Sequence, residues 1–265
     1  MSDYQVLGHD VSEIQRKIFE IFLEFDSICK RHHLRYTLEG GSLLGAVLYH
    51  DFIPWDDDMD IIMLRKDYDI FCQVANRELP KPFVFQDMRM NPEYPFLFGK
   101  CFNTDTVFKS GDTAHLSIPQ GVFLDIFVED NIHLRTKRLH SRLVSTLGTV
   151  KYIKHGVVKF RPKHILFLPF FFLTIPQLNR LADKVMRWYE NKETPYIYPL
   201  CESISSKPPL PRRLMTQLEP GVFHEFPVMI PVCHMWYLHK HYETPMEIPP
   251  PEKQHPSHGV IEIKL

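Results

Sequence analysis

The chain has 265 residues and is 44% hydrophobic, which is enough to bury the core of one large domain, with or without an insertion. A formal net charge of −1 and the lack of a recognised nucleic-acid motif argue against a nucleic-acid-binding function. Five scattered cysteines without a CxxC pair suggest neither a zinc site nor a disulfide framework, and residues 1–30 show no signal-peptide pattern. We therefore expect a globular protein of the reducing cytoplasm.

Residues 10–33 form the first predicted helix, because their apolar residues recur at spacings of three and four. Ser12 and Gln15 have the spacing of a capping box at its start. The apolar stripe is Val11, Ile14, Ile18, Ile21, Phe22, Phe25, Ile28 and Cys29. We expect this stripe to lie in the core.

Short strands and helices alternate after this helix. Strands are predicted near residues 35–39, 58–64, 83–87, 96–102 and 122–128. Further helices are predicted near residues 42–49, 66–78, 136–154 and 177–191. This alternation predicts an α/β or α+β fold with a mixed sheet.

A glycine pair follows the first predicted strand, where Gly40, Gly41 and Ser42 form a tight turn into a helix that begins near Ser42. Glycine lets the backbone approach a ligand closely, and the free amides of a helix N-terminus attract anions. Most Gly-Gly pairs are ordinary turns. The meaning of this pair therefore depends on the segment that follows it.

That segment holds four carboxylates within five residues, at Asp56, Asp57, Asp58 and Asp60. If it is a strand, Asp56, Asp58 and Asp60 share one face. Asp57 then points away from them and pairs with the turn. Carboxylates this close repel one another unless a cation or hydrogen-bond donors neutralise them. A row of hard oxygen ligands at a strand end is the arrangement that a Mg²⁺ site for phosphate chemistry needs.

Two other interpretations of the acidic segment exist. A solvated acidic loop is the simpler one, but the run leads directly into the apolar residues 61–64, which have the pattern of a buried strand. A calcium loop of the EF-hand type requires glycine at the sixth position, and counting from Asp56 that position is Ile61. The calcium loop is therefore excluded.

A further carboxylate, Asp125, lies inside the strand-like run GVFLDIFV of residues 121–128. A lone Asp among apolar residues is costly to bury without a metal, a cation or a proton. The alternative is an Asp that bonds a neighbouring backbone amide. A strand, a glycine turn, a short helix, Asp-x-Asp on the next strand and an acid on a later one is the layout of the nucleotidyltransferase superfamily.

These residues resemble the LicD family of cholinephosphotransferases, whose fold fukutin and fukutin-related protein share. The matching stretches are LEGGSLLGAVLYHDFIPWDDDMDI (38–61), LRKDYDIF (64–71), YPFLFGKCFNTDTVF (94–108), QGVFLDIFVED (120–130) and, more loosely, residues 223–258. Family members often carry a Tyr-Gly pair in this tail, whereas Tyr242 is followed here by Glu243.

The resemblance implies an α+β, nucleotidyltransferase-like fold in which helices flank a mixed sheet. It implies a transferase that moves a phospho-alcohol, such as phosphocholine, from a CDP-linked donor to a hydroxyl of a cell-surface glycan or glycolipid and releases CMP. Fukutin-like relatives use CDP-ribitol. By position, Asp58, Asp60 and Asp125 match the metal triad, which would hold Mg²⁺ or Mn²⁺, and Gly41 and Ser42 match the phosphate turn.

Three more residues are candidates for binding substrate. Lys100 is the best placed cation to balance the charge of a donor diphosphate, although a surface lysine fits the sequence equally. Trp55 suits stacking on a base or a quaternary ammonium, and a buried structural tryptophan is the alternative. Asp56 shares the metal-binding face.

The whole chain, residues 1–265, is expected to form one transferase domain, with a core over about 10–130, a helical insertion over about 131–190 and a C-terminal wrap over about 191–265. Residues 131–182 carry no acid and ten basic residues, namely Arg135, Lys137, Arg138, Arg142, Lys151, Lys154, Lys159, Arg161, Lys163 and Arg180. The apolar run at 165–175 is too short to span a bilayer. It is either a core helix with a basic solvent face or a peripheral membrane contact through residues 151–176. A lipid-linked acceptor at the inner face of the membrane fits the second interpretation.

Three rival functions remain open at this point. A nucleotidyltransferase would attach the nucleotide itself and release pyrophosphate. An inactive relative would only bind a glycan, although its mark, a broken acidic triad, is missing here. A metal-dependent phosphohydrolase would use water in place of the acceptor.

Overall fold

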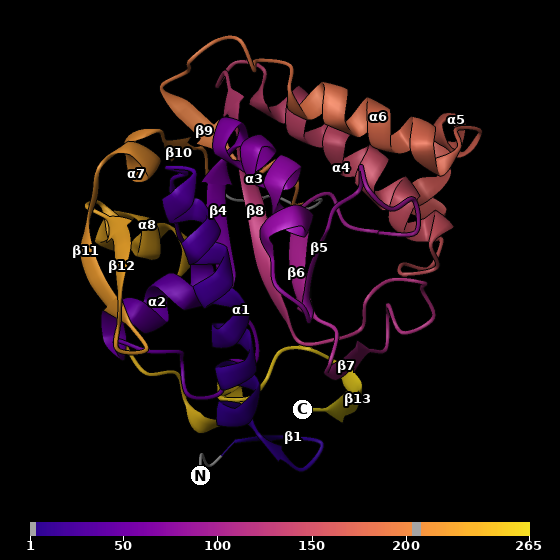
Figure 1. The fold of residues 1–265 in the computed structure, drawn as a ribbon. Helices are drawn as coiled ribbons and strands as arrows, with labels where there is room; N and C mark the ends of the chain where they lie inside the picture. Colours follow the sequence, from indigo (N-terminus) through magenta and orange to yellow (C-terminus); the bar gives the residue numbers. More distant parts are fainter. Residues whose placement is uncertain (1–3, 203–207) are drawn as a thin grey trace.

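The computed structural model describes residues 4–202 and 208–265, which are arranged around a mixed sheet of seven strands (Figure 1). One path through the sheet runs β10-β9-β8-β4-β3, while β6 pairs with β8 and β5 pairs with β6. The strands are β3 (Tyr36–Leu38), β4 (Asp60–Leu64), β5 (Phe83–Gln86), β6 (Gly99–Asn103), β8 (Phe123–Ile132), β9 (Tyr196–Tyr198) and β10 (Leu210–Pro211). Only β4 and β8 are parallel among these described pairs. The predicted α+β fold with a mixed sheet is confirmed.

All five predicted strands are present, and the differences at their ends have a structural reason. Strand β4 begins at Asp60, two residues later than predicted, because its pairing with β8 begins there. Strand β6 begins at Gly99, where its pairing with β8 begins. Strand β8 continues to Ile132 because β9 pairs with its second half.

Helix α1 (Val11–Arg31) covers one face of this sheet together with α3 (Arg65–Glu78) (Figure 1). The predicted apolar stripe of α1 is buried, as expected for a core helix. The predicted capping box is wrong, because the N-cap is Asp10, whose carboxylate accepts a hydrogen bond from the amide of Ser12. An aspartate at the N-cap satisfies a free helix amide as well as a serine does. Gln15 instead bonds the carbonyls of Ile53 and Asp56, so α1 supports the acidic segment.

The other side of β3 is covered by a hairpin and two helices (Figure 1). The hairpin consists of β11 (Leu218–Phe223) and β12 (Phe226–Pro231), and the helices are α2 (Gly40–Leu48) and α8 (His234–His241). The Thr37 hydroxyl of β3 donates to the carbonyl of Met229 at 3.0 Å. The short helix α7 (Arg213–Thr216) contacts β12.

The C-terminal segment returns to the core. After the short turn η2 (Pro251–Lys253), strand β13 (Val260–Lys264) pairs antiparallel with β7 (Val107–Ser110). Figure 1 shows the C-terminus beside β7, near the N-terminal ribbon formed by β1 (Gln5–Val6) and β2 (His9–Asp10). The residues just before β13 therefore lie next to the central strands.

The basic insertion forms a helical layer at one end of the molecule (Figure 1). Its elements are α4 (Lys137–Lys154), η1 (Pro162–Phe167), α5 (Leu168–Phe171) and α6 (Ile175–Met186), and α4 packs against α6. Helix α6 ends earlier than predicted, and Arg187 caps it through the carbonyls of Asp183 and Val185. In the described part of the chain no single helix is long and apolar enough to cross a membrane. Residues 162–171 and 175–186 meet that requirement only as a pair, bent by 97°.

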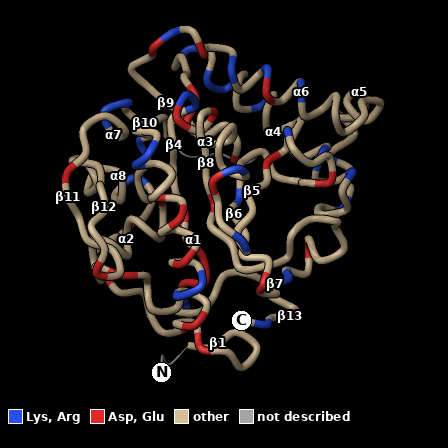
Figure 2. Tube along the Cα trace, viewed as in Figure 1, with Lys and Arg blue, Asp and Glu red and all other residues tan. Residues whose placement is uncertain are grey.

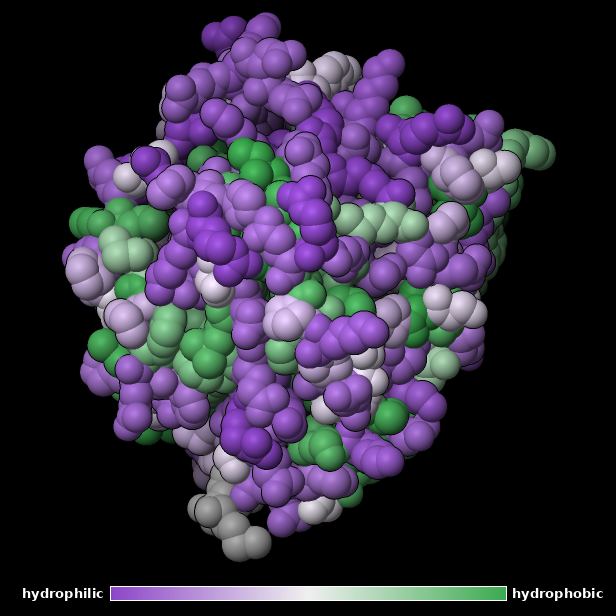
Figure 3. Space-filling view, in the orientation of Figure 1, coloured by the Kyte–Doolittle hydropathy of each residue, from purple (hydrophilic) through white to green (hydrophobic). Residues whose placement is uncertain are grey.

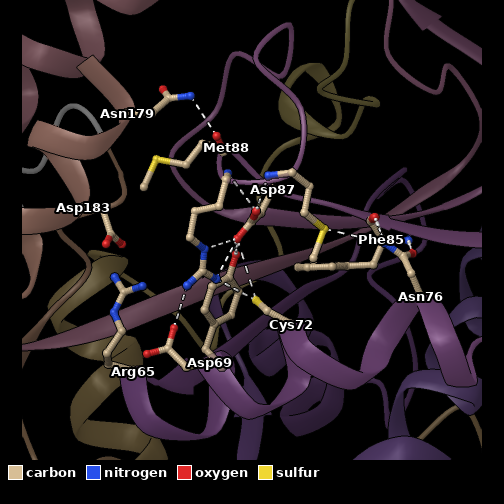
Figure 4. A network of polar contacts seen from close by, with 12 residues as sticks. Arg65, Asp69, Cys72, Asn76, Phe85, Asp87, Met88, Asn179 and Asp183 are labelled. Atoms are coloured by element: carbon tan, nitrogen blue, oxygen red, sulfur yellow. Dashed lines mark hydrogen bonds and ion pairs between the residues drawn. The ribbon is translucent and has the colours of Figure 1, made fainter. Parts of the chain in front are cut away.

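A polar network ties this layer to the core (Figure 4). Asp69 of α3 accepts hydrogen bonds from Arg89 at 2.8 Å and from Arg187, next to α6, at 2.6 Å. Arg89 also bonds Asp87 at 2.7 Å. The side-chain amide of Asn179 donates to the carbonyl of Met88 at 2.7 Å. The insertion is therefore fixed to the loop after β5.

Candidate active site

A row of polar side chains crosses the middle of the central sheet. Asp60 of β4 is the register partner of Asp125 of β8, and Asp125 is the partner of Lys100 on β6. Glu39, at the end of β3, donates its amide to the carbonyl of Asp60 at 3.0 Å. Side chains of register partners lie on the same face of a sheet. Strand pairing therefore places Glu39, Asp60, Asp125 and Lys100 side by side.

Of the two central acids Asp125 is buried and Asp60 is partly buried, and the pKa of each reflects its surroundings. Burial raises the pKa of Asp60 well above its usual range, and the nearby charges of Asp58 and Asp125 raise it further. Burial also raises the pKa of Asp125, although the ammonium of Lys100 acts in the opposite direction. Charge is thus concentrated here beyond what the protein side chains balance.

Lys100 balances part of that charge. Lys100 is only 5% exposed, and its Nζ forms an ion pair with Asp125 Oδ1 at 2.6 Å. The ammonium also lies 3.5 Å from the ring centre of Phe123 and 4.9 Å from that of Phe96. The alternative of a surface lysine is wrong, because β6 is an interior strand that directs this side chain into the row of acids.

The acidic segment divides between two environments. Asp56 and Asp58 lie together near Asp60, and burial together with the charge of Asp58 raises the pKa of Asp56 well above its usual range. Asp57 points away from them, as predicted, but it does not pair with the turn. Its buried carboxylate accepts hydrogen bonds from the amide of Ser257 and lies 3.1 Å from His258 Nδ1. The C-terminal segment had no sequence signal linking it to this position, and it supplies the nearest donors.

The glycine pair lies directly against these carboxylates. A Cβ at Gly41 would come within 2.6 Å of Asp56 Oδ2, and a Cβ at Gly40 within 3.6 Å of Asp60 Oδ2. Gly40 also has a φ of +51°, which favours glycine. Helix α2 starts at Gly40, two residues before the predicted start, so both glycines form its first turn. The amide end of a helix therefore faces a cluster of acids, an arrangement suited to anionic groups held through a cation.

Ser42 has a second role in the structure. Its buried hydroxyl accepts a hydrogen bond from the amide of Asp60 at 2.9 Å, which joins α2 to the start of β4. A hydroxyl that accepts one bond still has its proton to donate. Ser42 can therefore hold the strand and contact a phosphate oxygen at the same time.

Sequence reasoning missed three residues of the site. Tyr237 of α8 donates its hydroxyl to Glu39 Oε1 and accepts from the amide of Gly40, both at 3.3 Å. His258 lies between Asp57 and Asp58, with its Nε2 at 3.8 Å from Asp58 Oδ2. Only Glu39 had a local signal, as the acid that immediately precedes the glycine pair. Tyr237 and His258 come from distant segments, which a pattern in one stretch of sequence does not reveal.

The ionisation of His258 follows from these contacts. Burial by itself lowers the pKa of His258, but the hydrogen bond to Asp57 and the charge of Asp58 outweigh it, so the pKa lies above its ordinary value. The ring also makes an edge contact with Phe123, at 5.4 Å between centres. Protonation of the imidazole would thus partly offset the charge of Asp57 and Asp58.

Two pockets flank the acids. The first, of about 200 Å³, has Lys100, Asp125 and His258 on its walls together with several phenylalanines. The second, of about 490 Å³, lies beside α2 and contains Trp55 and Tyr242. Trp55 makes edge contacts with Tyr4 and Tyr49 and is half-buried, so it is neither fully buried nor free in solvent.

The second pocket reaches the glycine turn through Tyr242, whose Oη would lie 3.9 Å from a Cβ at Gly40. Among the described residues, its charged walls are Glu243, Glu247 and Lys253, so acidic groups predominate. The first pocket has Asp112 and Asp125 on its walls as well as Lys100, which is paired with Asp125.

The donors of the site fit a hard divalent cation by their chemistry. Asp58, Asp60 and Asp125 supply carboxylate oxygens, and burial together with neighbouring carboxylates raises the pKa values of Asp60 and Asp125, which a bound cation would oppose. Within residues 4–202 and 208–265, however, no group of three or more His, Cys, Asp or Glu side chains is arranged to hold a metal as it stands. The predicted metal site therefore stays a prediction.

Comparison with known proteins agrees with the site. Residues 33–141 match the family model described as LicD/FKTN/FKRP, nucleotidyltransferase domain. The lipopolysaccharide cholinephosphotransferase LicD of Haemophilus influenzae is 26% identical over 247 residues, which cover 88% of this chain and 90% of that protein. The ribitol 5-phosphate transferases FKRP of mouse and human are 56% identical over 34 residues, which cover 13% of this chain and 7% of those proteins.

The matched region begins just before β3 and continues into α4, so it contains the glycine turn, the acidic segment, Lys100 and Asp125. The match to the Haemophilus protein extends along most of both chains. The chain is therefore similar to the LicD family, in its domain at residues 33–141 and along most of the Haemophilus relative.

Proposed function

We propose that this LicD-like protein is a phospho-alcohol transferase that moves a phosphocholine-like group from a CDP-linked donor to a hydroxyl of a cell-surface glycan or glycolipid and releases CMP. The observation that carries the proposal is the register pair Asp60 and Asp125, with Lys100 beside it and the glycine turn above it. Its similarity to a named cholinephosphotransferase along 88% of its length supports the same reaction class.

Asp58, Asp60 and Asp125 would hold Mg²⁺ or Mn²⁺. When bound, such an ion neutralises the charge on the donor diphosphate and on the departing CMP. Asp58 and Asp60 are the principal ligands in this proposal. Asp125 has two candidate roles, as a further ligand or as the acceptor of the proton from the attacking hydroxyl.

The remaining groups position the donor. Gly40 and Gly41 allow a phosphate to approach the backbone, and the Ser42 hydroxyl keeps a proton to donate. Lys100 neutralises the Asp125 side of the site without leaving the protein interior. As the acceptor oxygen forms its bond to phosphorus, the bond to the CMP oxygen breaks and the hydroxyl proton leaves to a carboxylate or to solvent.

The second pocket supports a cationic alcohol on the donor. Its aromatic rings and carboxylates attract a quaternary ammonium, and it offers Trp55, Tyr242 and Glu243 for this purpose. Ribitol and glycerol carry no charge, so they would interact with these carboxylates only through hydroxyl hydrogen bonds.

The test is to incubate the protein with Mg²⁺, a glycan acceptor extract and CDP-choline, CDP-ribitol or CDP-glycerol, and to measure CMP by chromatography. Asp58→Asn should abolish CMP release, and Asp105→Asn, an exposed acid away from the row, should leave it unchanged. CMP from one donor would identify the alcohol. If no donor yields CMP but added CTP yields pyrophosphate, the protein is a nucleotidyltransferase. Turnover retained by Asp58→Asn would overturn the metal assignment.

A cytoplasmic location at the inner face of a membrane, with a lipid-linked acceptor, is part of the same proposal. Five free thiols, at Cys29, Cys72, Cys101, Cys201 and Cys233, support a reducing compartment.

A further inference from the structure

The loop and short helices between α4 and α6 carry an unusual concentration of exposed apolar side chains. Leu166 is 83% exposed and Phe172 is 90% exposed. The other exposed apolar residues of this segment are Val158, Phe160, Ile165 and Leu168. Figure 3 shows hydrophobic residues at the end of the molecule where α5 lies. Such a group on one short segment marks an interaction surface.

This apolar segment has two kinds of phenylalanine. Phe167, Phe170 and Phe171 pack against the core, whereas Phe172 points into solvent. The run at 165–175 is therefore neither wholly buried nor wholly exposed. The packed phenylalanines anchor the segment, so that Phe172 and its exposed neighbours face the solvent.

Exposed basic residues surround the apolar ones. They are Lys154, Lys159, Arg161, Lys163 and Arg180, and no Asp or Glu lies between residues 131 and 182. Figure 2 shows the basic positions of this layer around α4, α5 and α6. Exposed apolar and basic side chains on the same segment match the boundary between acyl chains and anionic headgroups.

The segment is held in place. The backbone amide of Arg161 donates to His164 Nδ1 at 3.0 Å, which closes the start of η1. Asn179 and Arg187 fix α6 to the core, and Figure 4 shows the hydrogen bond from Asn179 to the carbonyl of Met88. The exposed side chains are thus presented on a fixed platform and do not require a rearrangement of the core.

The same layer supports the walls of the first pocket from outside. The ammonium of Lys151 donates to the carbonyl of Phe96 at 3.1 Å, and Phe96 lines the pocket that contains Lys100. His115 Nε2 lies 2.7 Å from the carbonyl of His155, which joins the end of α4 to the loop leading into that pocket. The layer that carries the exposed segment is therefore joined directly to the chain around the pocket.

We propose that residues 154–172, together with Arg180, form a docking surface for a bilayer that contains anionic phospholipid, with the exposed apolar residues inserted at the headgroup boundary. Docking would hold the Lys100 pocket near the membrane, where a lipid-linked acceptor is available. The role of docking in reaching a lipid-linked acceptor rests on the proposed function, whereas docking itself does not.

The test is sedimentation of the full chain with vesicles of phosphatidylcholine alone and of phosphatidylcholine mixed with phosphatidylglycerol. Wild-type protein should sediment with the anionic vesicles and much less with the neutral ones. Leu166→Glu combined with Phe172→Glu should abolish sedimentation. Replacing Lys159, Arg161 and Lys163 by Gln should weaken it on the order of a hundredfold, since each basic side chain contributes about fivefold.

A matched control places the same charges elsewhere. Met229 and Val232 are also exposed apolar residues, and changing both to Glu should leave vesicle binding intact. Circular dichroism and CMP release with a soluble acceptor establish that each variant is folded, and they keep this result separate from the transferase proposal. The docking proposal is overturned if wild-type protein ignores anionic vesicles, or if Leu166→Glu with Phe172→Glu binds them normally. If the wild-type protein is a dimer that does not bind vesicles, and Leu166→Glu with Phe172→Glu makes it monomeric, the surface binds a second copy of the chain.

Discussion

Asp60 and Asp125 are direct register partners on the parallel strands β4 and β8, so two acids from segments far apart in the sequence lie side by side in the sheet. Parallel strands require a crossover connection, which here includes α3, β5 and β6. Hydrogen bonds of the sheet therefore fix the spacing of the two acids independently of their mutual repulsion. This permits several predictions about single side chains.

Replacing Asp60 by Asn should abolish activity and raise stability. Burial and the charges of Asp58 and Asp125 raise the pKa of Asp60, so the neutral amide removes both the cost of burying a charge and the repulsion between neighbouring acids. The measurement is urea unfolding in the presence of EDTA, alongside CMP release. Asp57→Asn is the matched control and should lower stability by about 1 kcal/mol, because it weakens the contacts with Ser257 and His258. If Asp60→Asn is less stable than the wild-type protein, the site does not carry an excess of negative charge.

Replacing Gly41 by Ala should reduce CMP release at least about tenfold, as a small displacement of a reacting group does. The new Cβ would lie 2.6 Å from Asp56 Oδ2, so the turn or the acidic segment has to move. Gly259→Ala is the control, because nothing lies within 4 Å of a Cβ built there. Equal rates for the two variants would show that the turn does not contact the reacting groups.

His258→Asn should lower kcat about tenfold and weaken activation by Mg²⁺. The reason is that the imidazole lies between Asp57 and Asp58 and orients Asp58. The rate is measured across a Mg²⁺ titration. His255→Asn, a nearby exposed histidine, should behave as wild type. A loss of kcat with an unchanged Mg²⁺ titration would argue that His258 does not act through Asp58.

Lys151 predicts a pH dependence of stability. The residue is 1% exposed, and burial lowers the pKa of its ammonium from 10.5 to about 7. Between these two values the unfolded chain binds a proton that the folded chain does not, so this group makes stability rise with pH from about 7 to about 10. Lys151→Met should remove that rise and make the protein more stable at pH 6. Urea unfolding of both proteins at several pH values checks this, and parallel curves would refute it.

Glu243 and Glu247 should influence which donor is used. Changing both to Gln removes the carboxylates of the second pocket, and we expect the preference for CDP-choline over CDP-ribitol to fall about tenfold. Trp55→Leu should have a similar effect, because an aliphatic side chain stays apolar but loses the aromatic face. The ratio of kcat/KM for the two donors is measured. An unchanged ratio in both variants would place the alcohol outside this pocket.

The strands, the main helices and the central acids could be predicted because their signals are local. The apolar run at Ile61–Leu64 and the pattern around Asp125 each identify a strand from its own residues. Once the strands are known, the layout brings their acids together. The burial of Lys100 was not predictable, since a single lysine in a short strand has no pattern that distinguishes inside from outside.

Contacts between distant segments account for what the sequence did not reveal. Asp57 and Ser257 are 200 residues apart, and Glu39 and Tyr237 are 198 apart. Neither partner has a periodicity or spacing that refers to the other. The start of α2 was misplaced for a related reason, because Glu39 serves as its N-cap without a side-chain hydrogen bond that a motif would describe.

The pairing of β13 with β7 sets an order of events during synthesis. Until His258 and the strand after it have left the ribosome, Asp57 lacks these partners and the side of the site opposite α2 stays open. Closing so long a loop is slow compared with forming local helices. A nascent chain can thus complete its sheet and still be without transferase activity, which begins only when this late segment has docked.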